Sequence, residues 1–254
     1  MRRFFCTTIP EVGGDFWLDG DEACHAVKVL RLGAGTRVEA LDGHGVIAEA
    51  VVTAVNRERR EERLGCRVEA RRVWAPAVNP VHLLVGPPRA KLMGQVVRQA
   101  TELGVWRLTP VLCAYSVARP DAAGGGLGHW RGEALAAIKQ SGNPFLPQLD
   151  EPMSFADAVA AVPGPGIFGA PVSAGGGRAF NFPAAGTVLP VWIGPEGGFN
   201  EEETAALQAG GHCPLALGRW VLRVETAVTA ILGHLNGLAG IKAGHCHADH
   251  GPSH

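Results

Sequence analysis

Two hydrophobic patterns divide the chain near residue 75. Up to that point, short runs of alternating apolar and polar residues are separated by turn residues, which is typical of β-strands. Thr36–Val55 alternates, turns at residues 42–45 and alternates again, so it predicts a hairpin, and Leu64–Trp74 predicts a further strand. Asp21–Leu32 predicts a short helix, and we interpret the charged stretch that begins at Asn56 as a solvated loop. Strands of this kind close most simply into a small barrel.

After the proline-rich segment 74–80, the period changes and strands alternate with amphipathic helices. Helices are expected at 90–104, 129–142, 154–162 and 221–240, and after Asn200, which precedes three glutamates as an N-cap would. Strands are expected at 81–85, 106–112, 166–170, 187–194 and 213–218. Alternation of this kind predicts an α/β domain with a mostly parallel sheet.

The last residues, 243–254, are polar and aperiodic, so we expect a disordered tail. The organisation predicted is therefore a β-rich domain at 1–73, an α/β domain at 80–242 and this tail. The tail contains His245, Cys246, His247 and His250, but no further ligands at metal-site spacing stand elsewhere, and we assign no metal.

Composition narrows the class of protein. With 46% hydrophobic and 19% charged residues and a net charge of −1, the chain has the composition of an ordinary globular protein without a polycationic segment. The six cysteines are far apart and form no C-x-x-C, which favours reduced thiols over a zinc module. Neither a signal peptide nor a membrane-spanning run is recognisable, so the expected location is the cytoplasm.

The candidate site lies where strands run into loops. In open parallel sheets, ligands bind beyond the carboxyl ends of the strands. Three late loops occupy such positions, at Gly169–Pro171, Gly194–Gly198 and Gly218–Arg223. The middle loop, Gly-Pro-Glu-Gly-Gly, lacks the Gly-Lys-Ser/Thr ending of a phosphate loop and carries a carboxylate. Walls made mainly of backbone suit a nucleobase or adenosine better than a phosphate.

Five segments, in this order, resemble the RsmE family of ribosomal RNA small-subunit methyltransferases, within the SPOUT superfamily: HAVKVLRLGAGTRVEALDGHG, ATELGV, IKQSGNPFLPQL, IGPEGGFNEEE and LALGRWVLRVETA. The resemblance implies a PUA-like β-barrel followed by a SPOUT-type α/β domain with a C-terminal trefoil knot. It also implies a homodimer, S-adenosylmethionine as methyl donor, and N3 of a uridine in 16S rRNA as acceptor, in free rRNA or in the small ribosomal subunit.

The resemblance assigns a cofactor role to residues that stand on the family's motifs: Gly194, Pro195, Glu196, Gly197, Gly198, Leu217, Gly218, Leu222 and Ala227. Gly169 is added as a cofactor candidate because it begins the first of the three strand-end loops. Two positions depart from the pattern. Trp220 stands where the family usually carries Arg, with Arg219 one place earlier, and Asn143 stands where Arg usually follows Gln-Ser-Gly.

Chemistry at N3 of uridine suggests the roles of three charged residues. Arg223 would stabilise negative charge on a uracil oxygen, and Glu196 or Glu225 would accept the N3 proton, with neither preferred. An ion pair between Arg223 and Glu225 that is purely structural competes with this interpretation.

RNA binding is assigned to basic, polar and aromatic residues, because N3 lies on the Watson–Crick edge and the uridine must be unpaired. The candidates are Arg2, Arg3, Phe4, Lys28, Arg31, Lys91, Arg98, Gln140 and Ser141, with Phe5, Trp130 and Phe145 as further aromatic candidates.

Three alternative functions remain at this stage. A dinucleotide oxidoreductase would explain the α/β pattern, but the glycine fingerprint after Val81–Val85 is missing. The departures at Trp220 and Asn143 leave room for a SPOUT methyltransferase that modifies another RNA base. They also leave room for a non-catalytic RNA-binding relative.

Overall fold

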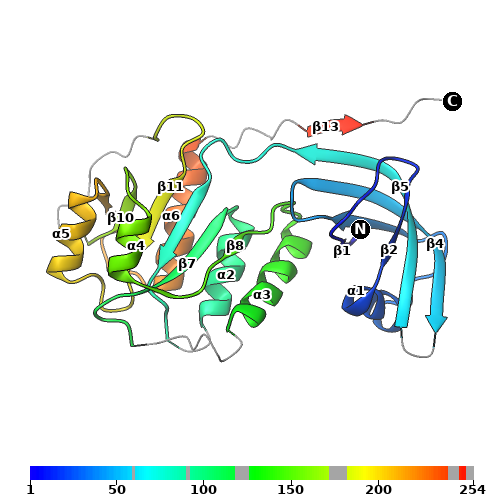
Figure 1. Cartoon of the computed structure of the whole chain (residues 1–254), viewed down its shortest axis with the longest axis horizontal. Helices are drawn as coiled ribbons and strands as arrows, with labels where there is room; N and C mark the ends of the chain where they lie inside the picture. The colour runs from blue at the N-terminus through cyan, green and yellow to red at the C-terminus, as the bar shows by residue number, and fades with distance from the viewer. Residues whose placement is uncertain (59–60, 90–91, 118–125, 172–181, 240–245, 250–254) are drawn as a thin grey trace. The chain divides into compact units, whose positions relative to one another are not determined.

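A computed structural model describes residues 1–58, 61–89, 92–117, 126–171, 182–239 and 246–249 of the chain. These residues form two compact units (Figure 1). The first comprises residues 1–76, 138–146 and 242–254, and the second comprises residues 77–137 and 147–241. The first division falls between residues 76 and 77, close to the change of hydrophobic pattern, and a short central segment, 138–146, is assigned to the first unit.

The first unit is built around a β-sheet, as the alternating pattern predicts. Its strands are β1 (Arg2–Phe5), β2 (Asp15–Leu18), β3 (Arg37–Leu41), β4 (Val46–Glu58) and β5 (Glu61–Trp74). The strand order is β1-β3-β4-β5, and β2 also pairs with β5. β3 and β4 form the predicted hairpin, with Val38 opposite Ala50. The alternate residues Val38, Ala40, Ala48 and Ala50 are buried in one core, which fixes the register.

The turn of that hairpin and the helix before it follow from local chemistry. Asp42 accepts hydrogen bonds on Oδ1 from the backbone N–H groups of His44 (2.7 Å) and Val46 (2.9 Å). The expected short helix is α1 (Gly20–Cys24), which continues as a π-helical turn, η1 (His25–Val29). Ala23 and Val27 are buried on its inner side.

The prediction of a solvated loop from Asn56 onward is wrong. β4 continues to Glu58 and β5 begins at Glu61, with Asn56 paired opposite Arg63. Two charged residues of β5 in this extension have partners in the first unit. Lys28 forms an ion pair with Glu62 (2.8 Å), and the Arg63 guanidinium lies 5.1 Å from the centre of the Trp17 ring. Opposite charges on paired strands are compatible with a ladder, so a high charge density alone does not predict a loop.

Part of the expected tail also has regular structure. Cys246–Asp249 form a four-residue strand, β13, which pairs antiparallel with β5. Strand β5 otherwise offers a free edge along this part of its length, and a free edge is a template for another strand. The remaining tail residues, including His245 and His250, lie outside the described residues.

The second unit contains the predicted parallel sheet. Its main strands are β6 (Val81–Val85), β7 (Arg107–Leu112), β8 (Gln148–Leu149), β10 (Ile167–Gly169), β11 (Leu189–Ile193) and β12 (Cys213–Leu215). Their order is β12-β10-β11-β6-β7-β8, all pairs are parallel, and a two-residue strand, β9 (Met153–Ser154), also pairs with β7. β11 lies between β10 and β6 and is buried along its whole length.

Five helices complete this part of the chain, close to the expected ranges. They are α2 (Leu92–Glu102), α3 (Gly126–Ser141), α4 (Phe155–Ala161), α5 (Glu201–Ala209) and α6 (Val224–Ala239). The Ser154 hydroxyl caps α4 by accepting from the Asp157 N–H (3.1 Å). Asn200 and Glu203 form a reciprocal capping box at the start of α5. The predicted N-cap at Asn200 is confirmed.

Helices cover both faces of this sheet, with α4 and α6 on opposite sides of the strands (Figure 1). On the face of α4 and α5, Leu84, Phe168 and Trp192 form one core with Ala158 and Leu207. On the other face, α6 packs against α2 and β11. Among the described residues, no helix is long and apolar enough to span a membrane.

Candidate active site

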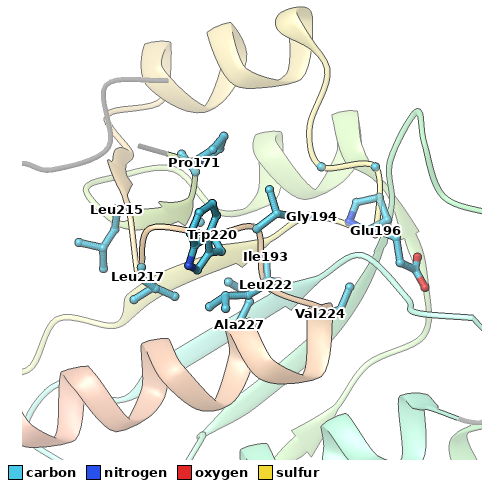
Figure 2. Close-up of a pocket in the computed structure, with 17 residues that line it drawn as sticks. Pro171, Ile193, Gly194, Glu196, Leu215, Leu217, Trp220, Leu222, Val224 and Ala227 are labelled. Atoms are coloured by element: carbon cyan, nitrogen blue, oxygen red, sulfur yellow. The ribbon is translucent and has the colours of Figure 1, made fainter. Parts of the chain in front are cut away.

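A cavity of about 340 Å³ opens at the carboxyl ends of β10, β11 and β12. These three strands are neighbours in the sheet, so the loops that follow them meet at one edge. The wall consists of residues from the three loops and from the start of α6 (Figure 2): Gly169, Ala170, Pro171, Ile193, Gly194, Pro195, Glu196, Gly197, Gly198, Leu215, Leu217, Gly218, Trp220, Val221, Leu222, Val224 and Ala227. All ten residues expected to bind the cofactor are in this wall.

The cavity is largely apolar, and among the described residues of its wall only Glu196 carries a charge. The described wall contains no lysine or arginine, the side chains that usually bind a phosphate. The Glu196 carboxylate is directed away from the cavity centre (Figure 2), and Oε1 accepts a hydrogen bond from the backbone N–H of Arg89 (3.0 Å). Glu196 therefore connects the Gly-Pro-Glu-Gly-Gly loop to the loop that follows β6.

Gly86 is a site residue that the sequence analysis missed. It follows β6, and its N–H donates to the Ile193 carbonyl (2.7 Å). A Cβ atom at this position would lie 2.4 Å from the backbone nitrogen of Pro195. Only glycine lets the β6 loop approach the Gly-Pro-Glu-Gly-Gly loop this closely. The glycine directly after the Val81–Val85 strand could have indicated this contact.

The loop after β7 also reaches the site and was not expected there. Cβ of Tyr115 would lie 2.8 Å from a Cβ atom added at Gly197, so the two loops are packed together. Glu203, which is 7% exposed, fixes the same loop: its Oε1 accepts from the Ala114 N–H (2.7 Å), and its Oε2 accepts from the Asn200 N–H (3.0 Å). In sequence, Glu203 indicates only a helix start, and its second contact requires the fold.

Arg223 and Glu225 do not line the cavity. They flank Val224, the first residue of α6, which does. Arg223 is exposed, Glu225 is half-buried, and within the described part of the chain neither forms an ion pair. The purely structural pairing between them, one of the two interpretations above, is therefore absent from this structure.

One of the proposed RNA contacts has to be corrected. Phe4 is 1% exposed and belongs to the core of the first unit, so its ring is inaccessible to RNA. The alternation of β1 places Phe4 on the inner face, whereas Arg3 and Phe5 are half-buried. Trp130 is also buried.

Several of the basic candidates have partners inside the protein. Arg3 forms an ion pair with Glu39 (2.8 Å) and donates to the carbonyl of Gln140 (2.9 Å) at the end of α3. Lys28 pairs with Glu62, and Arg98 pairs with Glu133 (2.6 Å). These guanidinium and ammonium groups are partly neutralised, which lowers their attraction for RNA phosphates.

The other RNA candidates are exposed or not described. Arg2, Arg31, Gln140 and Ser141 are exposed, and Lys91 lies outside the described residues. Asn143, which stands where the family usually has arginine, stabilises the turn after α3. Its Oδ1 accepts a hydrogen bond from the Phe145 N–H (3.0 Å).

The fold and the cavity define a class of protein, an RNA methyltransferase with a PUA domain. The family model described as RNA methyltransferase domain matches residues 76–236, and the model described as RNA methyltransferase PUA domain matches residues 18–59. The first match covers most of the chain and includes the whole cavity wall.

Similarity over the full length narrows this class. A ribosomal RNA small subunit methyltransferase E from Mycobacterium bovis is 31% identical over 243 residues, which cover 91% of this chain and 89% of the relative. The protein of the same name from Bacillus subtilis is 25% identical over 241 residues, covering 89% and 93%. The chain belongs to the ribosomal RNA small subunit methyltransferase E (RsmE) family.

A solved structure shares the fold. It is a ribosomal RNA small subunit methyltransferase E from Neisseria gonorrhoeae bound to S-adenosyl methionine. The superposition has a TM-score of 0.80 at 22% identity and covers 94% of this chain and 98% of the other.

Proposed function

We propose that this protein transfers a methyl group from S-adenosylmethionine to N3 of a uridine in 16S ribosomal RNA. The observation that carries the proposal is the apolar cavity at the carboxyl ends of β10, β11 and β12, with walls of backbone and aliphatic side chains. Family membership supplies the reaction, because the curated relatives carry the name ribosomal RNA small subunit methyltransferase E.

The residues of the cavity fit S-adenosylmethionine. A volume of about 340 Å³ is within the range of small-molecule sites. Leu215, Leu217 and Leu222 offer apolar surface to an adenine ring, and the glycine loops offer backbone hydrogen-bond groups. The described wall holds no lysine or arginine that would bind a phosphate, and it is compatible with a sulfonium cation.

When bound, S-adenosylmethionine supplies an electrophilic methyl group: a bond forms between N3 and the methyl carbon, the C–S bond breaks, and its electron pair neutralises the sulfonium. The N3 proton has to leave, because the N3 lone pair is the nucleophile. The protein must therefore orient the uracil ring, stabilise charge on its oxygens and exclude water.

We assign charge stabilisation to Arg223 and proton removal to Glu225, which flank the wall residue Val224. Arg223 has no ion-pair partner among the described residues, so its guanidinium is available to a uracil oxygen. Of the two candidate proton acceptors, Glu196 is engaged by the Arg89 N–H. Glu225, at the first turn of α6, is therefore the proton acceptor that we propose.

Finer features of the family form part of the proposal. We propose that the second unit carries the SPOUT trefoil knot: the chain leaves β12 at the sheet edge, passes the carboxyl ends of β10 and β11, and continues into α6, which packs against α2 and β11. We also propose a homodimer, an RNA-binding role for the PUA-like first unit, and action in the cytoplasm, on free rRNA or on the small subunit.

Methyl incorporation tests the proposal. Purified protein with labelled S-adenosylmethionine should modify 16S rRNA or small subunits that lack natural modifications, and nucleoside mapping should find the label at N3 of one uridine. Label on another base would contradict the acceptor that we propose. Binding of rRNA without any transfer would indicate a non-catalytic relative.

Arg223→Ala tests the assigned role within the same assay. With RNA and cofactor saturating, kcat should fall about 100-fold, because one donor to a developing oxyanion is lost. Arg131→Ala, a change at an exposed arginine on α3, is the matched control and should leave kcat unchanged. A wild-type kcat in Arg223→Ala would remove Arg223 from the mechanism.

A further inference from the structure

Trp220 is an exposed aromatic residue in the wall of the cavity. The side chain lines the cavity and is nevertheless 76% exposed, and the neighbouring Val221 is 84% exposed. In the close-up view the indole ring stands between Pro171 and Leu217, at the centre of the group of wall residues (Figure 2). Aliphatic residues such as Leu215, Leu217 and Leu222 already provide the inner apolar wall. A large exposed aromatic ring at a binding cavity indicates a surface for a ligand.

Arg219 gives this ring a defined environment. Its guanidinium lies 5.3 Å from the centre of the Trp220 ring, within the range of a cation–π contact. An adjacent planar cation restricts the orientations of the indole. The pair thus combines a flat apolar surface with a positive charge, as in proteins that bind unpaired nucleotides.

The charge of this loop discriminates between the two possible aromatic ligands, the adenine of the cofactor and a base of the RNA. Residues 216–223 contain Arg219 and Arg223 and no acidic residue. Within the described residues, neither arginine has an ion-pair partner. Two arginines without ion-pair partners attract the closely spaced phosphate groups of RNA, whereas the cofactor offers them a single carboxylate beside two positive charges. The rim formed by Arg219 and Trp220 therefore favours RNA over the cofactor.

We propose that Trp220, oriented by Arg219, is the stacking platform for the uridine that is presented for methylation. This inference rests on the function proposed above. A uridine with an accessible N3 has left its helical stack, and the indole ring replaces the lost stacking. A stacking role also explains why Trp220 stands where the family pattern usually has arginine. This chain keeps the basic residue one position earlier and places a flat ring where the pattern has arginine.

Three variants test the platform. Trp220→Ala removes the ring, Trp220→Phe keeps a smaller ring, and Trp106→Ala is the control. Trp106 is also exposed, at 44%, but it precedes β7 and so lies at the opposite, amino end of the strands. The measurements are the KM for 16S rRNA, the kcat, and the affinity for S-adenosylmethionine by calorimetry.

Trp220→Ala should raise the KM for RNA about 10- to 100-fold, the range for loss of one base–aromatic stack. Trp220→Phe should stay within about threefold of the wild type, because a phenyl ring also stacks on a base. In both Trp220 variants the affinity for S-adenosylmethionine should change less than the KM for RNA measured at saturating cofactor, and in Trp106→Ala it should equal that of the wild type. Trp106→Ala should bind RNA like the wild type.

Two results would overturn the platform. If Trp220→Ala weakens S-adenosylmethionine while the KM for RNA at saturating cofactor is unchanged, Trp220 is a cofactor wall. If the variant changes the sedimentation mass, the exposed ring belongs to an interface between two copies of the chain.

A direct binding measurement tests the stacking role of Trp220 independently of the proposed methyl transfer. A labelled, uridine-containing oligonucleotide can be titrated with wild type and Trp220→Ala even if no RNA is methylated. Weaker binding in Trp220→Ala without turnover in the wild type would support the platform and refute the enzymatic function. Equal binding would refute the platform whatever the turnover.

Discussion

The two ends of the parallel sheet in the second unit differ in how their polar groups are used. At the amino ends of β6 and β7, His82 Nε2 lies 2.7 Å from Thr109 Oγ1, Thr109 donates to Asp150, and Arg107 Nε binds the same carboxylate (2.7 Å). His82 and Thr109 are buried, and the polar groups of this network bind one another. At the carboxyl ends of β10, β11 and β12, glycine loops surround a cavity instead.

Polar groups at the amino ends of the sheet stabilise the fold, whereas the loops at the carboxyl ends can bind a ligand. Side chains that bind one another at the amino ends cannot also bind a ligand. The loops at the carboxyl ends have few side chains, and their approach depends on glycines such as Gly86. Changes at the amino ends should therefore affect unfolding without affecting binding, and changes at the loops should affect binding first.

Removing the carboxylate at the centre of the network should have the largest effect on stability. Asp150→Ala leaves Arg107 and Thr109 without their common partner, and we expect a loss of about 2–3 kcal/mol of unfolding free energy, after allowance for the partial exposure of Arg107. Denaturant unfolding measures this value, and the affinity for S-adenosylmethionine should be unchanged. Glu151→Ala, at the exposed neighbouring carboxylate, is the control and should change stability by less than about 0.5 kcal/mol. A weaker affinity for the cofactor in Asp150→Ala would show that the two ends are coupled.

The pH dependence of stability should report the same network through His82. Burial, and secondly the charge of Arg107, lower the pKa of His82 to about 4, and Asp150 opposes this shift. In the unfolded chain the pKa is the ordinary 6.5. Between pH 6.5 and 4 the unfolded state therefore binds a proton that the native state does not bind, so His82 makes the protein less stable as the pH falls.

His82→Gln should remove this contribution, which amounts to about 2 kcal/mol between pH 6.5 and pH 5. Denaturant unfolding at a series of pH values measures it. His129→Gln, at an exposed histidine on α3, is the control and should retain the wild-type slope. If the slope of His82→Gln equals that of the wild type, His82 is not held neutral by this environment.

At the other end, Gly86→Ala should act first on binding. The added Cβ meets the backbone nitrogen of Pro195, which cannot rotate away, so the Gly-Pro-Glu-Gly-Gly loop has to move. We expect the affinity for S-adenosylmethionine to fall about 10- to 30-fold, which corresponds to about 1.4–2 kcal/mol. Calorimetry measures this affinity.

The control for that change is Gly132→Ala in α3, where a Cβ has no neighbour within 4 Å. This substitution should leave the affinity unchanged and stabilise the protein by up to about 1 kcal/mol, because alanine is the better helix former. Wild-type affinity in Gly86→Ala would mean that the loop adapts and that the close approach is not required for binding.

Much of the fold could be predicted from local pattern. The predicted strand Val81–Val85 has the observed bounds, and the predicted hairpin and the predicted N-cap at Asn200 are both present in the structure. The charged stretch after Asn56 was misinterpreted, because its residues are polar on both faces and give no hydrophobic alternation to detect. Of the proposed site, the three glycine loops were recognised by their position after apolar strands.

The family motifs, most strands and helices of the second unit, and the loops that follow the strands of the site could be inferred from the sequence, because they depend on residues close together in the chain. The three-dimensional structure was needed to find that β11 lies between β10 and β6, that Gly86 is in contact with Pro195, and that Glu203 binds the Ala114 N–H. It also showed that Phe4 is buried and that Trp220 is exposed at the cavity. Such facts depend on contacts between residues far apart in the sequence, and neither spacing nor composition encodes which distant neighbour a side chain will meet.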